Sequence, residues 1–253
     1  MPRSARENLH TSFFHVIVQG INKSYIFEED KYKQEYLKFI KQASKKYNIE
    51  IISYCIMSNH AHLLIYSNNV NSLSMFMKEI NESYAKYYNY KENRVGYVFK
   101  SRFKSEPIIN QKYLLNCIAY IHNNPVKANM VEECEKYEFS SYRGYLKEEN
   151  FINKELIELI FGTKKLNIEE FKRIHKGKTY YFMEDNDNID ENMKEIIVEF
   201  ENMYGMQWKE IIKDKMRVKD ILFEIKERMK ISNNRLAKYF GINRCTIDRI
   251  INR

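Results

Sequence analysis

Strand-like and helix-like runs alternate along the first half of the chain, and their order restricts the fold more than any other feature. The runs at 13–20, 49–57 and 60–66 are short and rich in β-branched and aromatic residues, which favours strands. Residues 29–47 and 72–90 carry apolar side chains at helical spacing. The pattern therefore predicts helices inserted between short strands.

The remaining runs complete a repeated order. Ser58 and Asn59 join two of the strands as a tight hairpin. We expect a strand region with a basic connection at 95–109, and a further helix at 111–124 that Pro125 ends. A strand–helix–strand–strand–helix–strand order predicts an α+β domain, in which an antiparallel sheet is covered by helices on one face.

Charge is distributed unevenly along the chain of 253 residues, whose net charge is +8. Eight acids and one lysine fall within 184–201, whereas eight bases and two acids fall within 226–253. This asymmetry indicates a separate basic, all-α module at the C-terminal end, and it makes nucleic acid the expected partner. We therefore expect three parts, which are a domain at 1–147, a helical and polar connector at 148–191, and a module at 192–253.

Several classes of protein are excluded by simple counts. No run approaches eighteen apolar residues, so the sequence predicts no membrane span, and MPRSARENLH at the start has no apolar signal core. The four cysteines are scattered without a CxxC pair, which is typical of a reducing compartment. We expect a cytoplasmic protein that associates with the nucleoid and has no membrane partner.

The first candidate site is His60-Ala61-His62 within MSNHAHLLIY. In a strand, residues two apart point to the same face, so both imidazoles can converge on one cation. Imidazole suits divalent transition metals and also holds harder cations when oxygen ligands complete the coordination. The alternative is a pair of polar residues on a solvated strand face.

The second candidate lies on the helix QKYLLNCIAYIHNNP. Tyr120 and Asn124 fall one turn apart on one stripe of this helix. A phenol can attack phosphorus, and an amide oxygen can bind a metal. The alternative is a partly buried tyrosine and an asparagine that ends the helix before Pro125.

A third segment, RVGYVFKSRFKSEP, combines four bases with Tyr97, Phe99 and Phe103. Bases bind phosphate, and aromatic rings offer stacking surfaces for unpaired bases. The alternative is a strand whose polar face happens to be basic. The four candidate DNA-binding residues here are Arg94, Lys100, Arg102 and Lys104.

The C-terminal stretch 220–252 has the pattern of a helix–turn–helix, with a turn at Gly241. Residues 192–253 as a whole resemble the DNA-binding domain of bacterial replication initiators, or the Trp-repressor-like group. The alternative is an ordinary small helical bundle with a basic surface. The side chains expected to reach base edges or phosphates of duplex DNA are Asn243, Arg244, Thr246 and Arg249.

Three blocks in order, MSNHAHLLIY, NRVGYVFKSRFKS and CIAYIHNNPVKANMV, resemble the signature blocks of the single-tyrosine HUH transposases. The branch that they resemble is that of the REP-associated tyrosine transposases, and HVIVQGINKSYIF is similar to the first strand and loop of that group. The resemblance covers about residues 8–146. It implies a ferredoxin-like or RRM-like HUH nuclease domain, followed here by the helix–turn–helix module.

The resemblance also implies a mechanism and a set of residues. Tyr120 would attack a phosphodiester of single-stranded or hairpin DNA, forming a 5′-phosphotyrosine link and releasing a 3′-hydroxyl. His60, His62 and Asn124 would hold Mg²⁺ or Mn²⁺ against the scissile phosphate. Many relatives carry glutamine where this chain has Asn124, and Asn116 is a lesser candidate for that ligand.

Two other functions compete with a metal-dependent tyrosine transposase. One is a catalytically silent DNA-binding regulator derived from such an enzyme, and the other is an HxH metal hydrolase acting on small molecules. The basic charge and the helix–turn–helix pattern argue against the hydrolase. Relatives occur as monomers and as homodimers that share active sites, and the sequence leaves both states open.

Overall fold

A computed structural model describes residues 11–108, 110–146, 152–162, 167–177, 180–182, 189–229 and 231–251. The chain divides into two compact units, Met1–Gly177 and Lys178–Arg253. Of the helices within the described ranges, none is long and apolar enough to cross a membrane.

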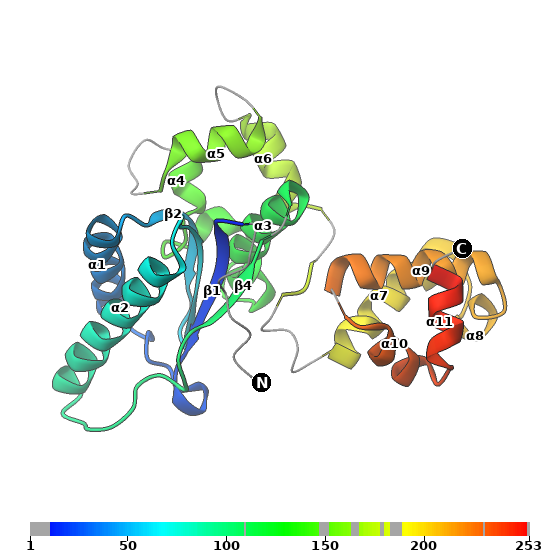
Figure 1. Ribbon diagram of the computed structural model, residues 1–253, viewed down its shortest axis with the longest axis horizontal. Helices are drawn as coiled ribbons and strands as arrows, with labels where there is room; N and C mark the ends of the chain where they lie inside the picture. Colours follow the sequence, from blue (N-terminus) through cyan, green and yellow to red (C-terminus); the bar gives the residue numbers. More distant parts are fainter. Residues whose placement is uncertain are drawn as a thin grey trace. The chain divides into compact units, whose positions relative to one another are not determined.

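The first unit is built on a four-stranded antiparallel sheet with the strand order β2-β3-β1-β4 (Figure 1). The expected hairpin is present, because β2 and β3 pair directly on either side of Ser58 and Asn59. The strands are β1 (Phe13–Gln19), β2 (Glu50–Ile56), β3 (His60–Tyr66) and β4 (Lys104–Pro107). The helices are α1 (Asp30–Tyr47), α2 (Val70–Lys91), α3 (Gln111–Lys127), α4 (Tyr142–Leu146), α5 (Lys154–Phe161) and α6 (Ile168–His175), with 3-10 turns at Ile21–Lys23 and Cys134–Lys136.

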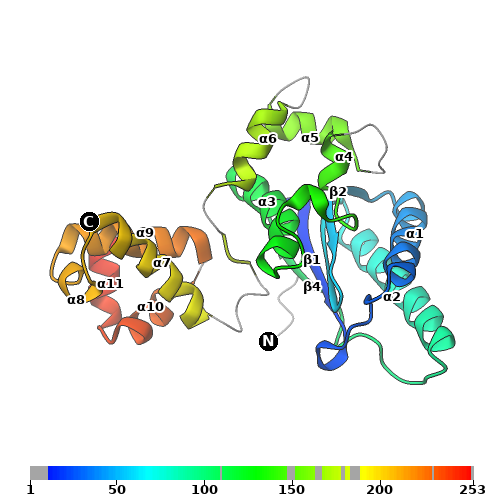
Figure 2. The same cartoon turned by 180° about the vertical axis from the view of Figure 1, so that it is seen from behind.

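The α+β class and the antiparallel sheet are confirmed, but helices cover both faces of the sheet instead of one. Figures 1 and 2 show α1 and α2 on one side of the sheet and α3 on the other. The strands explain this difference, since the five central residues of both β1 and β3 are buried in succession. A strand that is buried at every position needs cover on both faces. Side chains of β1 and β3 on the second face contact α3.

The helix α3 does not end before Pro125 as expected, but continues to Lys127. Proline removes only its own N–H donor, and here it lies in the last turn, where that loss costs one intrahelical bond. The following turn is closed by the N–H of Ala128 on the carbonyl of Asn124 at 3.0 Å, and by the N–H of Met130 on that of Pro125 at 2.9 Å. Asn124 therefore keeps its helical place on the same helix as Tyr120.

The basic segment at 94–107 is a loop as far as residue 103, and only its end forms the edge strand β4. Gly96 has φ +103°, a conformation that glycine adopts without strain and that interrupts a strand. The C-terminal part of the loop is fixed to the sheet, because the N–H of Lys100 donates to the carbonyl of Gln19 of β1 at 2.8 Å. The ring of Phe99 packs against Tyr84 with a centroid separation of 6.0 Å.

Part of the expected connector belongs to the first unit. The helices α5 and α6 lie within the expected connector at 148–191. Some of the other residues of that range are outside the described ranges. The N–H of Asn153 donates to the carbonyl of Ile51 at 3.0 Å, and α6 packs against α3. The outer edge of β2 is covered by Asn153 and by Ser141, whose N–H donates to the carbonyl of Tyr54. Covering an edge strand in this way prevents pairing with other chains.

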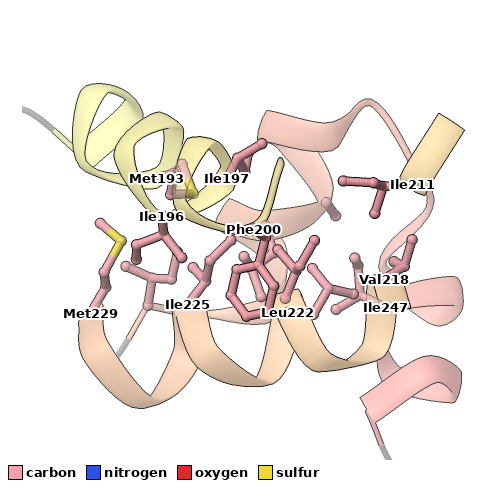
Figure 3. Close-up of a cluster of buried hydrophobic side chains, with 14 of the residues drawn as sticks. Met193, Ile196, Ile197, Phe200, Ile211, Val218, Leu222, Ile225, Met229 and Ile247 are labelled. Carbon is pink, nitrogen blue, oxygen red and sulfur yellow. The ribbon is translucent and has the colours of Figure 1, made fainter. Parts of the chain in front are cut away.

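The second unit is helical throughout its described elements, as the sequence predicts. Its helices are α7 (Ile189–Tyr204), α8 (Trp208–Ile211), α9 (Lys215–Met229), α10 (Asn233–Phe240) and α11 (Arg244–Ile251). Figure 3 shows Ile196 and Phe200 of α7 beside Leu222 and Ile225 of α9 in one apolar core. The fully buried Ile247 joins α11 to that core.

Candidate active site

The two histidines of β3 lie on one face of the sheet, as strand alternation requires. Their rings meet edge to face, with centroids 4.9 Å apart and an interplanar angle of 87°. His62 is fully buried and pairs with Ile17 of β1 and Cys55 of β2, whereas His60 at the first position of β3 is half-buried. The predicted pair therefore lies where β3 begins, with one ring covered and one nearer the surface.

Tyr120 reaches this pair from α3. Its ring lies edge to face against His62, with centroids 5.6 Å apart and an angle of 88°. Tyr120 and His62 are 58 positions apart in the sequence, and the packing of α3 on the sheet brings them together. Tyr120 is 4% exposed, so these contacts and its neighbours cover almost all of the residue.

The last turns of α3 add an amide and a cation beside the phenol. The Asn124 side-chain nitrogen donates to the carbonyl of Tyr120 at 2.9 Å, which leaves the amide oxygen as the atom of Asn124 that could bind a metal. The Lys127 ammonium lies 4.8 Å from the centroid of the Tyr120 ring. The positive charge of Lys127 therefore lies over the face of the Tyr120 ring. Sequence reasoning missed Lys127, although it lies seven residues after Tyr120 on the same stripe.

A third histidine, His15 of β1, belongs to the same cluster. Its Nε2 lies 3.0 Å from Nδ1 of His62, and the two rings are close to parallel. The ring of His15 also meets that of Tyr120 edge to face at 5.9 Å. Sequence reasoning missed this residue as well. The available signal was a histidine in the middle of FFHVIVQ, where every neighbour is apolar or aromatic.

The donor set fits a divalent cation. Nδ1 of His60 lies 2.5 Å from Oδ1 of Asn59, and Nδ1 of His62 faces His15, so each ring presents Nε2 as its second nitrogen. Metal-binding histidines commonly hold one nitrogen in such a contact while the other binds the metal. No cluster of three His, Cys, Asp or Glu metal ligands occurs in the described ranges. Two imidazoles therefore need an oxygen ligand from another kind of residue, and Asn124 has one.

The four bases of the third candidate segment line the loop and the edge strand. Lys100 and Arg102 are exposed in the loop, and Lys104 is exposed at the start of β4, antiparallel to Ile17. Arg94 is half-buried, and its guanidinium donates to the carbonyl of Tyr97 at 3.2 Å. The structure thus places three of the four bases on the surface.

The aromatic residues of that segment differ in their surroundings. Tyr97 is 83% exposed and has a free face for stacking, whereas Phe103 is half-buried. Phe99 does not serve as a stacking surface, because its ring packs among Phe27, Tyr36 and Tyr84 between the sheet and its helices. Its apolar ring is stabilised by burial there.

In the second unit, α10 and α11 are joined by a short turn at Gly241, whose φ is +64°. Asn243 is exposed, and its side-chain oxygen accepts from the N–H of Cys245 at 2.8 Å, which caps the start of α11. Arg244 and Arg249 are exposed, and Thr246 is half-buried. Three of the four residues predicted to contact duplex DNA are therefore exposed, two at the start of α11 and Arg249 in its last turn.

Two further buried histidines form a separate chain of hydrogen bonds. His175 of α6 donates from Nδ1 to the carbonyl of Phe171 at 2.7 Å, and its Nε2 accepts from Nδ1 of His122 at 2.9 Å. Nε2 of His122 in turn lies 2.7 Å from the hydroxyl of Ser141 and 3.0 Å from that of Ser53. The contact between the two rings needs a neutral His175, and burial lowers the pKa of His175 to about 4 and that of His122 well below its ordinary value.

Comparison with known proteins identifies relatives of the first unit. Residues 8–124 match the family model described as transposase IS200-like. A Haemophilus influenzae protein assigned to the REP-associated tyrosine transposases is 28% identical over 147 residues, which cover 54% of this chain and 82% of the relative. The matched range of the family includes all of His60, His62, Tyr120 and Asn124.

Two solved structures are similar to parts of the chain. One is a REP-associated tyrosine transposase bound to a REP hairpin, which is 20% identical and aligns with a TM-score of 0.49 over 58% of this chain and 86% of its own. The other is a Deinococcus radiodurans protein assigned as a transposase, which is 10% identical and aligns with a TM-score of 0.34 over 45% of this chain and 91% of its own.

Proposed function

Because residues 8–124 match the model of the IS200-like transposases, we propose that this chain is a tyrosine transposase of that family, and that it cuts and rejoins single-stranded or hairpin DNA through Tyr120. The observation that carries the proposal is the contact between the rings of Tyr120 and His62. It joins a nucleophile on α3 to a pair of imidazoles on β3, the combination that phosphodiester cleavage by a tyrosine needs.

In the first step the phenol oxygen of Tyr120 attacks the scissile phosphorus. A bond forms between that oxygen and phosphorus, the bond from phosphorus to the 3′-oxygen breaks, and the phenol proton leaves to solvent. The departing 3′-oxygen takes a proton and becomes a hydroxyl. The 5′-phosphate then remains on Tyr120, and attack by another 3′-hydroxyl reverses the step and joins a new strand. The phosphotyrosine bond conserves the energy of the cleaved bond, so no nucleotide cofactor is consumed.

His60 and His62 would hold Mg²⁺ or Mn²⁺ through Nε2, and the amide oxygen of Asn124 would complete the protein ligands. A bound cation polarises the phosphoryl oxygen and offsets the charge that develops on it. The protein itself supplies orientation, since the buried ring of His62 fixes where Tyr120 lies. The Lys127 ammonium, which lies over the Tyr120 ring, would supply positive charge near the phosphate that Tyr120 attacks.

The DNA strand would follow the basic loop toward the start of β3. Lys100, Arg102 and Lys104 supply phosphate contacts, and the exposed ring of Tyr97 offers a stacking surface for an unpaired base. Hydrogen bonding between Lys100 and Gln19 ties this loop to the strand end that pairs with His60. The loop and the cation site therefore share one end of the sheet.

The second unit would bind duplex DNA through α11. Its exposed Asn243, Arg244 and Arg249 suit base edges and phosphates of a major groove, and Thr246 lies beside them. This role is separable from cleavage, because it uses residues outside the range that matches the transposase family.

The test is a cleavage assay on single-stranded and hairpin oligonucleotides from the DNA that flanks the gene, with Mn²⁺ or Mg²⁺. Wild type should give a covalent protein–DNA adduct that a chelator abolishes, and Tyr120→Phe should give none. Tyr113→Phe is the matched control, because Tyr113 is a buried tyrosine of the same helix whose hydroxyl donates to Glu106. An adduct of equal yield from Tyr120→Phe would overturn the assignment of the nucleophile. Tight binding without any adduct would favour a silent regulator.

A further inference from the structure

His15 is a buried polar residue in the middle of an apolar strand. It is fully buried in β1, between Phe14 and Val16, which are also buried. A buried imidazole is costly unless it is hydrogen-bonded, and here Nε2 of His15 meets Nδ1 of His62 at 3.0 Å. The hydrogen bond with His62 therefore offsets part of the free-energy cost of burying the His15 side chain.

The contact can form with either residue as the donor, and only one of the two arrangements suits cation binding by His62. A neutral imidazole has one N–H and one acceptor nitrogen, so Nδ1 of His62 donates only if Nε2 of His15 accepts. The proton then sits on Nδ1, and Nε2 of His62 keeps the lone pair that a cation needs. Asn59 does the same for His60, since Oδ1 of Asn59 can only accept.

His15 also restrains the nucleophile. Its ring lies nearly parallel to that of His62, at 15° and 5.3 Å, and edge to face with that of Tyr120, at 77° and 5.9 Å. One side chain thus touches both the inner imidazole of the candidate metal pair and the phenol. Phe or Leu at position 15 would fill the space but would offer no acceptor to His62.

We propose that His15 is a positioning residue that fixes the tautomer and the ring orientation of His62 for cation binding and holds the ring of Tyr120 beside it. The proposal rests on the metal-dependent strand transfer proposed above. Loss of such a supporting contact lowers metal affinity by about 10- to 100-fold.

Two variants separate the hydrogen bond from the packing. His15→Phe keeps a ring against Tyr120 and removes the acceptor, whereas His15→Gln offers an amide oxygen near the place of Nε2. Mn²⁺ binding to the full-length protein, followed by electron paramagnetic resonance, should weaken about 10- to 100-fold in His15→Phe and only a few-fold in His15→Gln. His175→Gln is the control for loss of another buried histidine and should bind Mn²⁺ like wild type.

The tautomer is measured separately, without metal, from long-range ¹H–¹⁵N correlations of the histidine rings. His62 should carry its proton on Nδ1 in wild type and in His15→Gln, and should populate the Nε2–H form in His15→Phe. Equal Mn²⁺ affinity in wild type and His15→Phe, or an Nε2–H tautomer of His62 in wild type, would overturn the role of His15. Unchanged Mn²⁺ affinity in His60→Ala would instead refute the proposed metal site. The tautomer measurement would then still test whether His15 sets the protonated nitrogen of His62.

Discussion

The hydrogen-bonded pair of His122 and His175 predicts that the first unit loses stability in mild acid. In the folded state each imidazole donates from Nδ1 and accepts at Nε2, in a chain that runs from Ser141 to the carbonyl of Phe171. A second proton on Nε2 of His175 would place two donors against each other, because that nitrogen accepts from Nδ1 of His122. Burial is the main cause that lowers the pKa of both rings, to about 4 for His175 and well below the ordinary value for His122.

The magnitude follows from the difference between folded and unfolded proton affinity. An unfolded histidine takes up its proton near pH 6.5, whereas folded His175 does so only near pH 4. The contribution of neutral His175 is therefore fully present above pH 6.5 and is lost as the pH falls toward 4. At pH 5 the loss amounts to about 2 kcal/mol, and it approaches about 3 kcal/mol below pH 4. Protonation of His122 also lowers the free energy of unfolding as the pH falls, because burial lowers its pKa in the folded state as well.

Urea unfolding of wild type and His175→Gln at pH 7.5 and pH 5 measures this contribution. Circular dichroism follows both units, and the fluorescence of Trp208, the single tryptophan, follows the second unit alone. Between the two pH values, the variant should lose about 2 kcal/mol less than wild type in the transition of the first unit. The Trp208 transition should be the same in both proteins. Equal losses in the first unit would refute the assignment of neutral, titrating histidines to this chain.

Three further changes probe other parts of the account. Lys127→Met should slow adduct formation severalfold, because it removes the positive charge beside Tyr120, whereas Lys127→Arg should retain most of the wild-type rate; a single-turnover assay compares them. Replacing both Lys100 and Arg102 by Ala should reduce the slope of log affinity against log salt concentration for oligonucleotide binding by about two. An unchanged slope would show that this loop does not contact the DNA. Ile247→Ala should destabilise the second unit by about 2–5 kcal/mol in the Trp208 transition, because the side chain is fully buried in its core.

Much of the first unit could be predicted because local patterns carried the information. Strand alternation in HAHLLIY placed His60 and His62 on one face, and helical spacing placed Tyr120 and Asn124 on one stripe. The presence of helices on both faces of the sheet could also be predicted from the sequence of β1. The run VIV in β1 has no polar alternation, which is typical of a strand buried on both sides.

Other features depended on contacts that no local pattern encodes. His15 meets His62 only because β1 and β3 pair in a register that sets His15 opposite Leu64. His175 meets His122 across 53 positions, through the packing of α6 on α3. The aromatic residues at 95–109 have high strand propensity and predict a strand region, but residues up to 103 form a loop in which Phe99 packs against side chains of α1 and α2.

The most direct test of the central claim is to identify the residue that carries the DNA. The covalent adduct would be digested with trypsin and nuclease, and the modified peptide sequenced by mass spectrometry. Cleavage after Lys112 and Lys127 yields YLLNCIAYIHNNPVK, which contains both Tyr113 and Tyr120. The account predicts a nucleotide 5′-phosphate on Tyr120 alone. A modification on Tyr113, or on a peptide from another part of the chain, would contradict it.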